Sequence, residues 1–568
     1  RWCAVPARVR RHPVMPFLLL LLLTLILLPD SWSQPFWCLS ETSPRPADFV
    51  VSAALTWLAV AAVLAFARVI AARVTCGLAL DPGRRERLLR DYGRFRTYHV
   101  FVLIGTYVVS VYLFGWGWTV RSLCQYGGEM VPGAELFILA PFVAAMVLSW
   151  VIFYDAERAL HDTAEPESPE PAEPYWSRGA YVGFHARQNL ALICAPLLLL
   201  LLMKGLHRLF PKSATGAAGG AITLGGALLS LTVIVTMPWL LRLALGLKPM
   251  PPGPLRTRLE ATARRLGFRC NNILLWNTRG GVANAMVAGV VPWLRYVILT
   301  DRLMSELTPD EVEAVFGHEM GHAKHHHMLL YLGFLAVSVM LLGVVWSWVA
   351  AVVFKLPSDQ VDTTLASVPL VTMLGAYIFV VFGFLSRRCE RQADVFGCRA
   401  VSCGRPDCEG HDDTTPLSGG GAAPRPHGLR RVLDVFVRPV QPLRGTSLCP
   451  TGIRTFIEAL EKVARINGIS RDRPGWLSSW QHSTIARRVQ FLQDVLANRG
   501  LERRFQRRVA LVKAGMFVAL VATLVALSYT FEVYTPEGAP AAHESQPYHP
   551  GGAGDVTPHT GERTAPSE

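Results

Sequence analysis

Residues 312–345 read VEAVFGHEMGHAKHHHMLLYLGFLAVSVMLLGVV, and the two halves of this stretch have opposite character. The first half is crowded with histidine and charged residues, which favour water or a metal ion. The second half is apolar enough to lie in lipid. The pattern therefore predicts a polar helix over 307–327 that continues directly into a membrane span.

The composition of the whole chain also indicates a membrane protein. With 568 residues, of which 51% are hydrophobic, and a mean hydropathy of +0.30, the chain is too apolar for an ordinary soluble enzyme. Its formal charge of +14 is explained by arginine and lysine collected in cytoplasmic loops. We therefore predict no nucleic-acid partner.

Apolar runs long enough to span a bilayer recur along the chain. They cover residues 49–67, 99–116, 136–154, 190–203, 221–245, 328–354, 365–385 and 509–527. Before them, a shorter apolar run over 17–28 follows several arginines, which is typical of a signal-peptide core or a short signal anchor. Met15 precedes this run and is a candidate start.

The charges of the loops orient these spans. Eight arginines lie between residues 68 and 96, whereas the next loop, 117–135, holds one. Because positively charged loops stay in the cytoplasm, the arginine-rich segment is predicted to be a cytoplasmic loop. Alternating from there, 312–327 and 386–394 reach the same cytoplasmic face.

The segment 307–327 has the residues expected at a helix start, with Thr308 as the cap and Pro309 in the first turn. In such a helix His318 and His322 lie four residues apart, so both imidazoles reach a single zinc ion from one face. Glu319 follows the first histidine, where its carboxylate reaches a zinc-bound water without binding the metal. This is the HEXXH pattern of zinc hydrolases.

A catalytic zinc ion needs a third protein ligand and an open fourth position. The nearest candidate ligand is Glu390 in RRCERQADVFG, which the predicted hairpin brings to the same face. Asp394 lies one helical turn further on, where it can orient a ligand or an arginine. The alternative is a solvated juxtamembrane helix with incidental histidines. This interpretation requires the helix, the topology and the third ligand to be separate coincidences.

Three ordered segments resemble one known family. They read NAMVAGVVPWLRYVILTDRLMSELTPDEVEAVFGHEMGHAKHHH (284–327), SRRCERQAD (386–394) and WQHSTIARRVQFL (480–492), with a membrane hairpin between the first two. In combination they are similar to the gluzincin family that contains the type I CaaX prenyl endopeptidase and the HtpX heat-shock membrane protease.

This resemblance implies one Zn²⁺ ion bound by His318, His322 and Glu390, with Glu319 as the general base. His327 also matches the family, without an assigned role. The two histidines before it are interpreted as interfacial residues or as groups that support the metal ligands.

The family's late H-P-P-like motif falls on His482, which by this resemblance steadies the tetrahedral intermediate. Ser483 and Thr484 replace proline here, a departure that concerns the geometry of the loop. The alternative for His482 is a surface histidine of the polar domain. Arg488 matches the arginine that follows in the family, and the resemblance implies that it pairs with Asp394.

Residues 272–300 are rich in β-forming residues around the sequence TRGG and are predicted to form short strands. A strand beside the zinc helix offers a free edge to which a peptide substrate adds as another strand. In the family the NA pair lies at this edge, so Asn284 and Ala285 are candidate substrate-binding residues. The alternative is that both only pack.

A second metal site is a further hypothesis. Cys398, Cys403, Cys408 and His411 in CRAVSCGRPDCEGH form a Cys/Cys/Cys/His set, which is a legitimate structural zinc set. Their irregular spacing is as typical of free thiols or of a disulfide as it is of a zinc site.

The predicted fold class is mostly α, a polytopic transmembrane helical bundle with a zincin-type metalloprotease domain that contains a small β-sheet. The predicted divisions are a leader and short external segment (1–47), an N-terminal transmembrane bundle (48–247), a zincin domain with strands and the HEXXH helix (248–327), a transmembrane hairpin (328–385), the completion of the catalytic domain (386–508), a C-terminal transmembrane helix (509–530) and a disordered tail (531–568).

The expected function is zinc-dependent hydrolysis of peptide bonds in membrane-associated protein or peptide substrates near the cytoplasmic face, as in a CaaX prenyl endopeptidase. One alternative is a heat-shock-type protease for membrane-protein quality control, and another is a non-catalytic membrane scaffold or transporter. The expected location is a bacterial inner membrane, with membrane lipids and substrates as partners. The oligomeric state stays open.

Overall fold

The computed structural model describes residues 45–126, 129–131, 133–163, 175–189, 217–352, 375–403, 448–472, 483–498 and 500–534, together with residues 37, 198, 202 and 408. The predicted fold class is confirmed, because the described chain is mostly helical with a small mixed sheet. The leader run 17–28, most of the run 190–203, His411, His482 and the tail from 535 lie outside the described residues.

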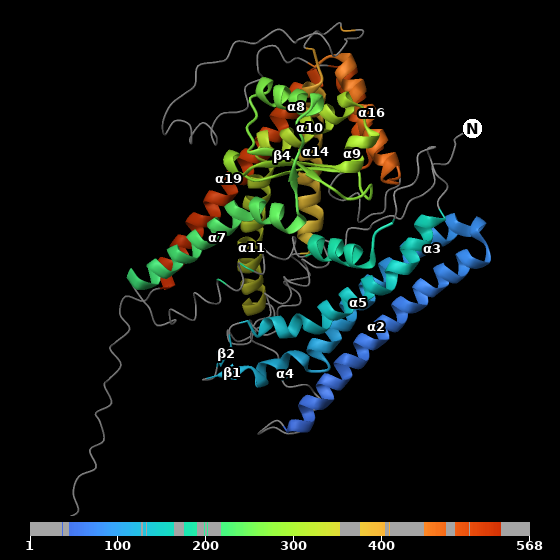
Figure 1. Ribbon diagram of the computed structural model, residues 1–568. Helices are drawn as coiled ribbons and strands as arrows, with labels where there is room; N and C mark the ends of the chain where they lie inside the picture. Colours follow the sequence, from blue (N-terminus) through green and yellow to red (C-terminus); the bar gives the residue numbers. More distant parts are fainter. Residues whose placement is uncertain are drawn as a thin grey trace, which may run out of the picture.

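The N-terminal part is a bundle of long helices (Figure 1). Its elements are α2 (Pro46–Leu80), η1 (Pro82–Arg84), α3 (Arg85–Tyr112), α4 (Trp116–Leu123), β1 (Gln125–Tyr126), β2 (Glu129–Met130), α5 (Glu135–Asp162) and α7 (Ala217–Leu245). Helices α2, α3 and α5 pack through two apolar clusters. On α5 the buried Glu157 accepts a hydrogen bond from the Tyr92 hydroxyl at 3.1 Å and pairs with Arg96, so its charge is compensated inside the bundle.

The predicted span over 99–116 is a bent pair of helices in the structure. α3 ends at Tyr112, and α4 begins at Trp116 and runs at 50° to it. Gly115 between them has a φ of 73°, a left-handed conformation that costs glycine no steric penalty. Because the apolar composition continues through the bend, the hydropathy of the sequence did not reveal it.

The arginine-rich segment 68–96, predicted as a loop, is largely helical, and that part of the prediction was wrong. α2 continues to Leu80 and α3 begins at Arg85, so only residues 81–84 connect the two helices. Arginine is a good helix former, and its long side chain keeps the charged end in water while the stem covers apolar surface. The segment therefore extends both helices beyond their apolar parts.

Four described helices are long and apolar enough to cross a membrane. They are Pro46–Leu80, Leu136–Asp162, Leu224–Leu245 and His327–Trp346, and the bent pair of α3 and α4 adds a fifth if it is counted as one span. The predicted C-terminal run 509–527 lies in α19 (Gly500–Tyr534). The protein is therefore an integral membrane protein.

The sheet has four strands in the order β3-β4-β6-β5. They are β3 (Lys248–Pro249), β4 (Asn272–Trp276), β5 (Ala285–Ala288) and β6 (Tyr296–Thr300). β4 and β6 are parallel, whereas β3 and β5 run antiparallel to their neighbours. The predicted strands 272–300 are thus present, and β5 lies at one edge of the described sheet.

The two faces of the sheet are covered by different parts of the chain. Residues of β6 are buried throughout, and alternate side chains point to opposite faces. Val297 and Leu299 pack against the α10 helix (Pro309–Lys324) and α8 (Pro254–Arg265). Tyr296 and Ile298 pack toward the end of α7 and the half-buried Phe184. The sheet therefore joins the polar domain to the membrane bundle.

The stretch that was predicted as one polar helix leading into a span is two helices. α10 ends at Lys324, α11 (His327–Val352) begins three residues later, and His326 between them has a φ of 56°. A non-glycine residue in this left-handed conformation costs about 1 kcal/mol. The His325 and His326 amides bond back to Gly321 and Ala323, which closes the polar helix before the apolar one begins.

The remaining helices complete the domain. They are η2 (Pro292–Leu294), α9 (Asp301–Glu306), the π-helical turn η3 (Ile378–Phe382), α14 (Gly383–Ala400), α16 (Pro450–Ile466) and α18 (Ile485–Ala497). Phe334 of α11 stacks on Tyr377 at 5.8 Å, so the two described limbs of the predicted hairpin lie side by side. α11 and α19 run away from the sheet and its covering helices (Figure 1).

Candidate metal centre

The candidate metal centre lies where α10 and α14 cross. Glycines on α10 allow the two helices to approach closely. A Cβ added at Gly321 would lie 2.9 Å from the Cβ of Phe396 and 3.0 Å from the Cα of Ala393, and one added at Gly317 would collide with Ala400. The glycine inside the HEXXH motif thus brings the third-ligand candidate on α14 within reach of the two histidines.

The three predicted ligands converge in the structure. The Nε2 atoms of His318 and His322 are 3.2 Å apart. The carboxylate oxygens of Glu390 lie 3.7 Å from the first Nε2 and 3.6 Å from the second. The side chain of Glu390 is only 5% exposed, and the histidine side chains are 11% and 16% exposed.

This donor set fits zinc. Ligand atoms about 2.0–2.1 Å from a tetrahedral zinc ion lie about 3.3 Å from one another. The three separations in the structure bracket this value within a few tenths of an ångström. Two imidazoles and one carboxylate also leave the fourth position open, which is the arrangement of a catalytic rather than a structural zinc site.

His318 is oriented by a buried carboxylate. Its Nδ1 lies 3.0 Å from Asp394 Oδ1, and Asp394 in turn accepts a hydrogen bond from Arg488 Nε at 2.9 Å. Burial opposes both charges, but the Asp394 carboxylate raises the pKa of His318, and Arg488 lowers the pKa of Asp394. With Nδ1 directed at Asp394, Nε2 faces the metal position. The implied Asp394–Arg488 pair is therefore present.

His322 is oriented by a different chain of groups. Its Nδ1 lies 3.0 Å from Nδ1 of His327, whose Nε2 lies 3.0 Å from Gln392 Oε1. Lys513 donates to the same amide oxygen at 3.1 Å, so that oxygen accepts from His327 as well. His327 therefore accepts a hydrogen bond from His322 through Nδ1, which leaves His322 Nε2 for the metal.

The sequence analysis did not predict this chain of hydrogen bonds from His322 to Gln392. His327 matched the family without a role, and Gln392 drew no attention because it lies on another helix, 65 residues away. The two preceding histidines do not join it. Burial, with Lys513 nearby, lowers the pKa of His325 to about 3, so His325 is neutral at physiological pH.

Glu319, the predicted base, is half-buried on α10 next to His318. Arg488 has a second contact at the site, because its Nη1 lies 3.5 Å from Glu390 Oε2. The predicted oxyanion residue His482 lies outside the described residues. Directly after it, Ser483 is buried with a φ of 65°, and Thr484 caps α18 by accepting a hydrogen bond from the Arg487 amide.

The candidate substrate residues lie at the described edge of the sheet. Asn284 has an exposed side chain, and its main-chain oxygen accepts a hydrogen bond from the Thr300 amide at 3.0 Å. Main-chain groups alternate in direction along an antiparallel strand. The N–H and C=O of Ala285 therefore point away from β6, toward the open edge, and so do those of Val287.

The predicted cysteine set is only partly brought together. Cys403 and Cys408 lie close to each other and to Cys449, which the sequence analysis did not include. Cys398 is instead fully buried in the apolar cluster between α14 and α16, and His411 lies outside the described residues. The missed signal was the position of Cys449 directly before Pro450, where a helix begins.

The chain is similar to known proteins. Residues 252–412 match peptidase family M48. The chain is 31% identical over 183 residues to a "Protease HtpX homolog" of Pyrobaculum calidifontis, covering 31% of this chain and 50% of the relative. It is 30% identical over 83 residues to "CAAX prenyl protease 1" of Saccharomyces cerevisiae, covering 14% of this chain and 18% of that protein.

A solved structure is also similar. The crystal structure of Ste24p from S. mikatae aligns with a TM-score of 0.46 and 15% identity, over 79% of this chain and 99% of that one. The chain spans half or less of the length of the curated relatives named above.

Proposed function

We propose that this chain, whose residues 252–412 match peptidase family M48, is a membrane-embedded, zinc-dependent endopeptidase of the gluzincin type. The observation that carries the proposal is the convergence of His318, His322 and Glu390 at distances that suit one zinc ion. The family match and the apolar helices support a membrane metalloprotease. The ligand set and the roles of individual residues are our proposal.

A zinc ion held by these ligands supplies Lewis-acid chemistry, lowering the pKa of water and polarising a carbonyl group. Glu319 accepts a proton from the attacking water and donates it to the nitrogen of the leaving amine. His482, by the resemblance to the family, donates to the oxyanion. Asp394 and His327 keep the ligand histidines in the tautomer that leaves each Nε2 for the metal.

The proposed substrates are extended peptide segments of membrane-associated proteins. A substrate strand adds to the edge of β5, where Ala285 and Val287 offer main-chain groups, and this places the scissile amide beside α10. The membrane helices that accompany the domain favour substrates within or close to the bilayer. A CaaX-type substrate is our first choice and membrane-protein quality control is the second, because relatives of both names are similar to this chain.

The site is proposed to face the cytoplasm of a bacterial inner membrane. The arginine-rich ends of α2 and α3 support this orientation, because positively charged segments next to spans stay in the cytoplasm. The partners proposed are membrane lipids and protein or peptide substrates.

Chelator-sensitive cleavage by the full-length protein tests the proposal. Purified protein in lipid nanodiscs is incubated with a CaaX peptide and with a misfolded membrane protein, with and without a zinc chelator. We expect cleavage of at least one substrate that stops with the chelator and returns with zinc. Zinc-containing protein that cleaves neither would instead support the non-catalytic scaffold or transporter.

A further inference from the structure

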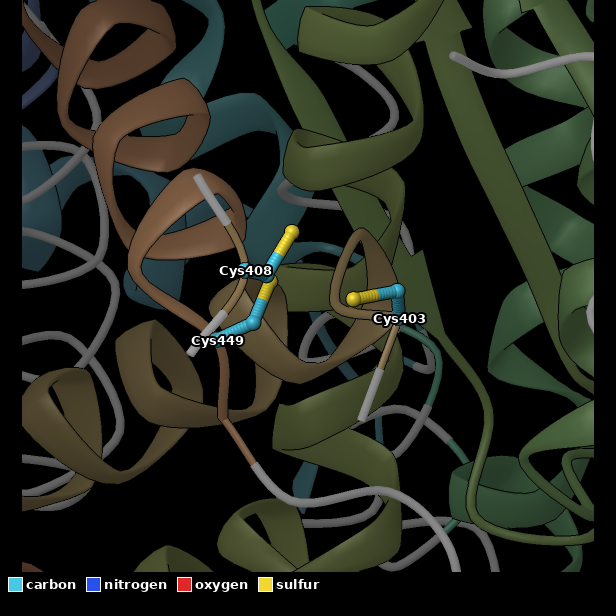
Figure 2. Close-up of side chains that lie close together, drawn as sticks. All are labelled: Cys403, Cys408 and Cys449. Carbon is cyan, nitrogen blue, oxygen red and sulfur yellow. The ribbon is translucent and has the colours of Figure 1, made fainter. Parts of the chain in front are cut away.

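Three cysteines come together away from the HEXXH motif. Cys403 follows the end of α14, Cys449 is the residue directly before α16, and Cys408 lies between them in the sequence. Their sulfur atoms all lie within 4.8 Å of one another. Figure 2 shows the side chain of Cys403 directed toward the other two. Cys408 and Cys449 are buried, and Cys403 is half-buried.

We propose that Cys403, Cys408 and Cys449 supply three of the four ligands of a second, structural zinc ion. Sulfur atoms about 2.3 Å from a tetrahedral zinc ion lie about 3.8 Å from one another, which is within the separation found here. A disulfide joins only two sulfurs, at about 2.05 Å, and leaves the third cysteine of such a cluster unexplained. Three thiolates favour zinc over magnesium or calcium, which prefer oxygen ligands.

Polar groups lie close to two of the sulfurs. The amide of Gly452 donates a hydrogen bond to Cys449 Sγ at 3.2 Å. The Thr451 hydroxyl lies 3.6 Å from Cys408 Sγ. Both groups belong to the first turn of α16, where the partial positive charge of the helix favours an anionic thiolate. Hydrogen bonds to ligand sulfurs of this kind are typical of thiolate metal sites.

A positively charged side chain lies beside the cysteine cluster. Three thiolates and one Zn²⁺ ion carry a net charge of −1. Arg265 of α8 donates to the carbonyl oxygens of Ala400 and of Ser402, the latter at 3.4 Å, which places its guanidinium beside the residue that precedes Cys403.

The backbone at Cys449 and beside Cys403 is held in place by hydrogen bonds within the protein. The amide of Cys449 donates to Ser402 Oγ at 3.2 Å, and that hydroxyl donates to the Cys398 carbonyl oxygen at 2.7 Å. A Cβ added at Gly452 would collide with the same Ser402 oxygen. The end of α14 and the start of α16 are thus already in contact, so binding needs little rearrangement.

The role that follows is to fix α14 and α16 to each other. Forty residues lie between Cys408 and Cys449, and a metal that closes so long a loop stabilises the fold by restricting the unfolded chain. α14 carries Glu390, and Phe456 of α16 stacks on His318 at 5.9 Å. Glu390 lies ten helical residues before the end of α14, about 15 Å along the axis, so one ion cannot serve both sites.

Counting zinc per chain tests the proposal. Full-length protein is purified in detergent with reductant, and zinc is measured by mass spectrometry against protein concentration. We expect two zinc ions per chain in the wild type and one in Cys403→Ser and in Cys408→Ser. Cys270→Ser, which changes a half-buried cysteine elsewhere in the same domain, keeps both.

A second measurement leaves the cysteines intact. The double variant His318→Ala/His322→Ala removes the HEXXH ligands, and we expect it to retain one metal ion per chain. After exchange of zinc for Co²⁺, it should show the intense near-ultraviolet absorption of cobalt bound by thiolates, which a nitrogen and oxygen site lacks. This measurement tests the proposal even if a cysteine variant fails to fold.

A single zinc ion in the wild type, together with no thiolate absorption in the double variant, would overturn the proposal. A disulfide between two of the three cysteines in protein that holds one zinc ion would do the same. Substrate cleavage is measured in parallel. Protein that binds two zinc ions and cleaves nothing supports this site while contradicting the proposed function.

Discussion

His327 Nδ1 lies 3.0 Å from His322 Nδ1, so one of the two proposed zinc-binding histidines is positioned by a third histidine. His327 is only 1% exposed and is fixed in turn by Gln392, whose amide oxygen also accepts a hydrogen bond from Lys513 of α19. Helix α19 is thereby linked to the metal centre through the side chains of Gln392 and His327.

Replacing His327 with phenylalanine should weaken zinc binding at the HEXXH site. The ring volume is nearly kept, but His322 loses the acceptor that holds its tautomer, and such losses cost about 10- to 100-fold in metal affinity. Chelator competition measures the affinity. His325→Gln is the control, because the His325 ring stacks on His327 at 5.7 Å but lies outside the hydrogen-bonded chain that runs from His322 through His327 to Gln392. Equal affinities in both variants would contradict the positioning role.

Gly321→Ala should separate α10 from α14. The added Cβ would lie 2.9 Å from the Cβ of Phe396 and 3.0 Å from the α14 backbone, closer than van der Waals contact allows. Overpacking of this kind costs about 1–3 kcal/mol. We expect a lower thermal midpoint and a lower zinc content, because Glu390 moves away from the two histidines. Gly333→Ala on α11, where the added Cβ meets nothing within 4 Å, should change neither. A Gly321→Ala protein with wild-type zinc content would show that the close approach does not matter.

Ala285→Pro should impair substrate binding without unfolding the sheet. The N–H of Ala285 points to the open edge, so proline there removes a donor to the substrate strand and none to β6. Loss of one such hydrogen bond, about 1.4 kcal/mol, predicts about a tenfold rise in KM. The matched variant Met286→Pro removes an N–H that faces β6 and should lower the thermal midpoint instead. If both variants lose stability and KM is unchanged in Ala285→Pro, the substrate does not bind at this edge.

Glu311 should make the stability of the domain depend on pH. Burial opposes its ionisation, but Lys462, at 2.9 Å, and the Thr308 amide lower the pKa of Glu311 below its ordinary value. A lowered pKa in the folded state means that the stabilisation is present above the unfolded value and is lost as pH falls through the folded one. Glu311→Gln keeps an oxygen to accept from the Thr308 amide, so it removes only the charge.

We therefore expect Glu311→Gln to be less stable than the wild type by up to about 1 kcal/mol at neutral pH, since the pair is partly exposed. The difference should shrink as the pH falls below about 4.5. Thermal unfolding of both proteins across this range measures it. Lys462→Met should reproduce the neutral-pH loss, and a difference that stays constant with pH would exclude the ion pair as its cause.

Local rules predicted much of the site. Thr308 and Pro309 begin α10 as their residue types require, with Thr308 and Glu311 forming a capping box. The four-residue spacing placed His318 and His322 on one face, and the strand pattern over 272–300 matched β4, β5 and β6. These features depend on neighbours in the sequence, which is why sequence alone sufficed.

Features that depend on tertiary contacts were not predictable in this way. The break at His326 needs a left-handed residue in a stretch whose composition allows one continuous helix. The link from His322 through His327 to Gln392 joins two helices 65 residues apart in sequence. Cys449 stands next to Cys403 and Cys408 only because α14 and α16 meet end to start. The bend at Gly115 was hidden by uniform hydropathy.

The central claim is that His318, His322 and Glu390 hold zinc for a reaction in which Glu319 is the base. Its most direct test is Glu319→Gln, assayed for zinc content and for cleavage of the substrate that the wild type cleaves. We expect wild-type zinc content and a loss of at least about 10² to 10⁴ in kcat, since the general base is removed. A variant that retains zinc and cleaves at the wild-type rate would contradict the account.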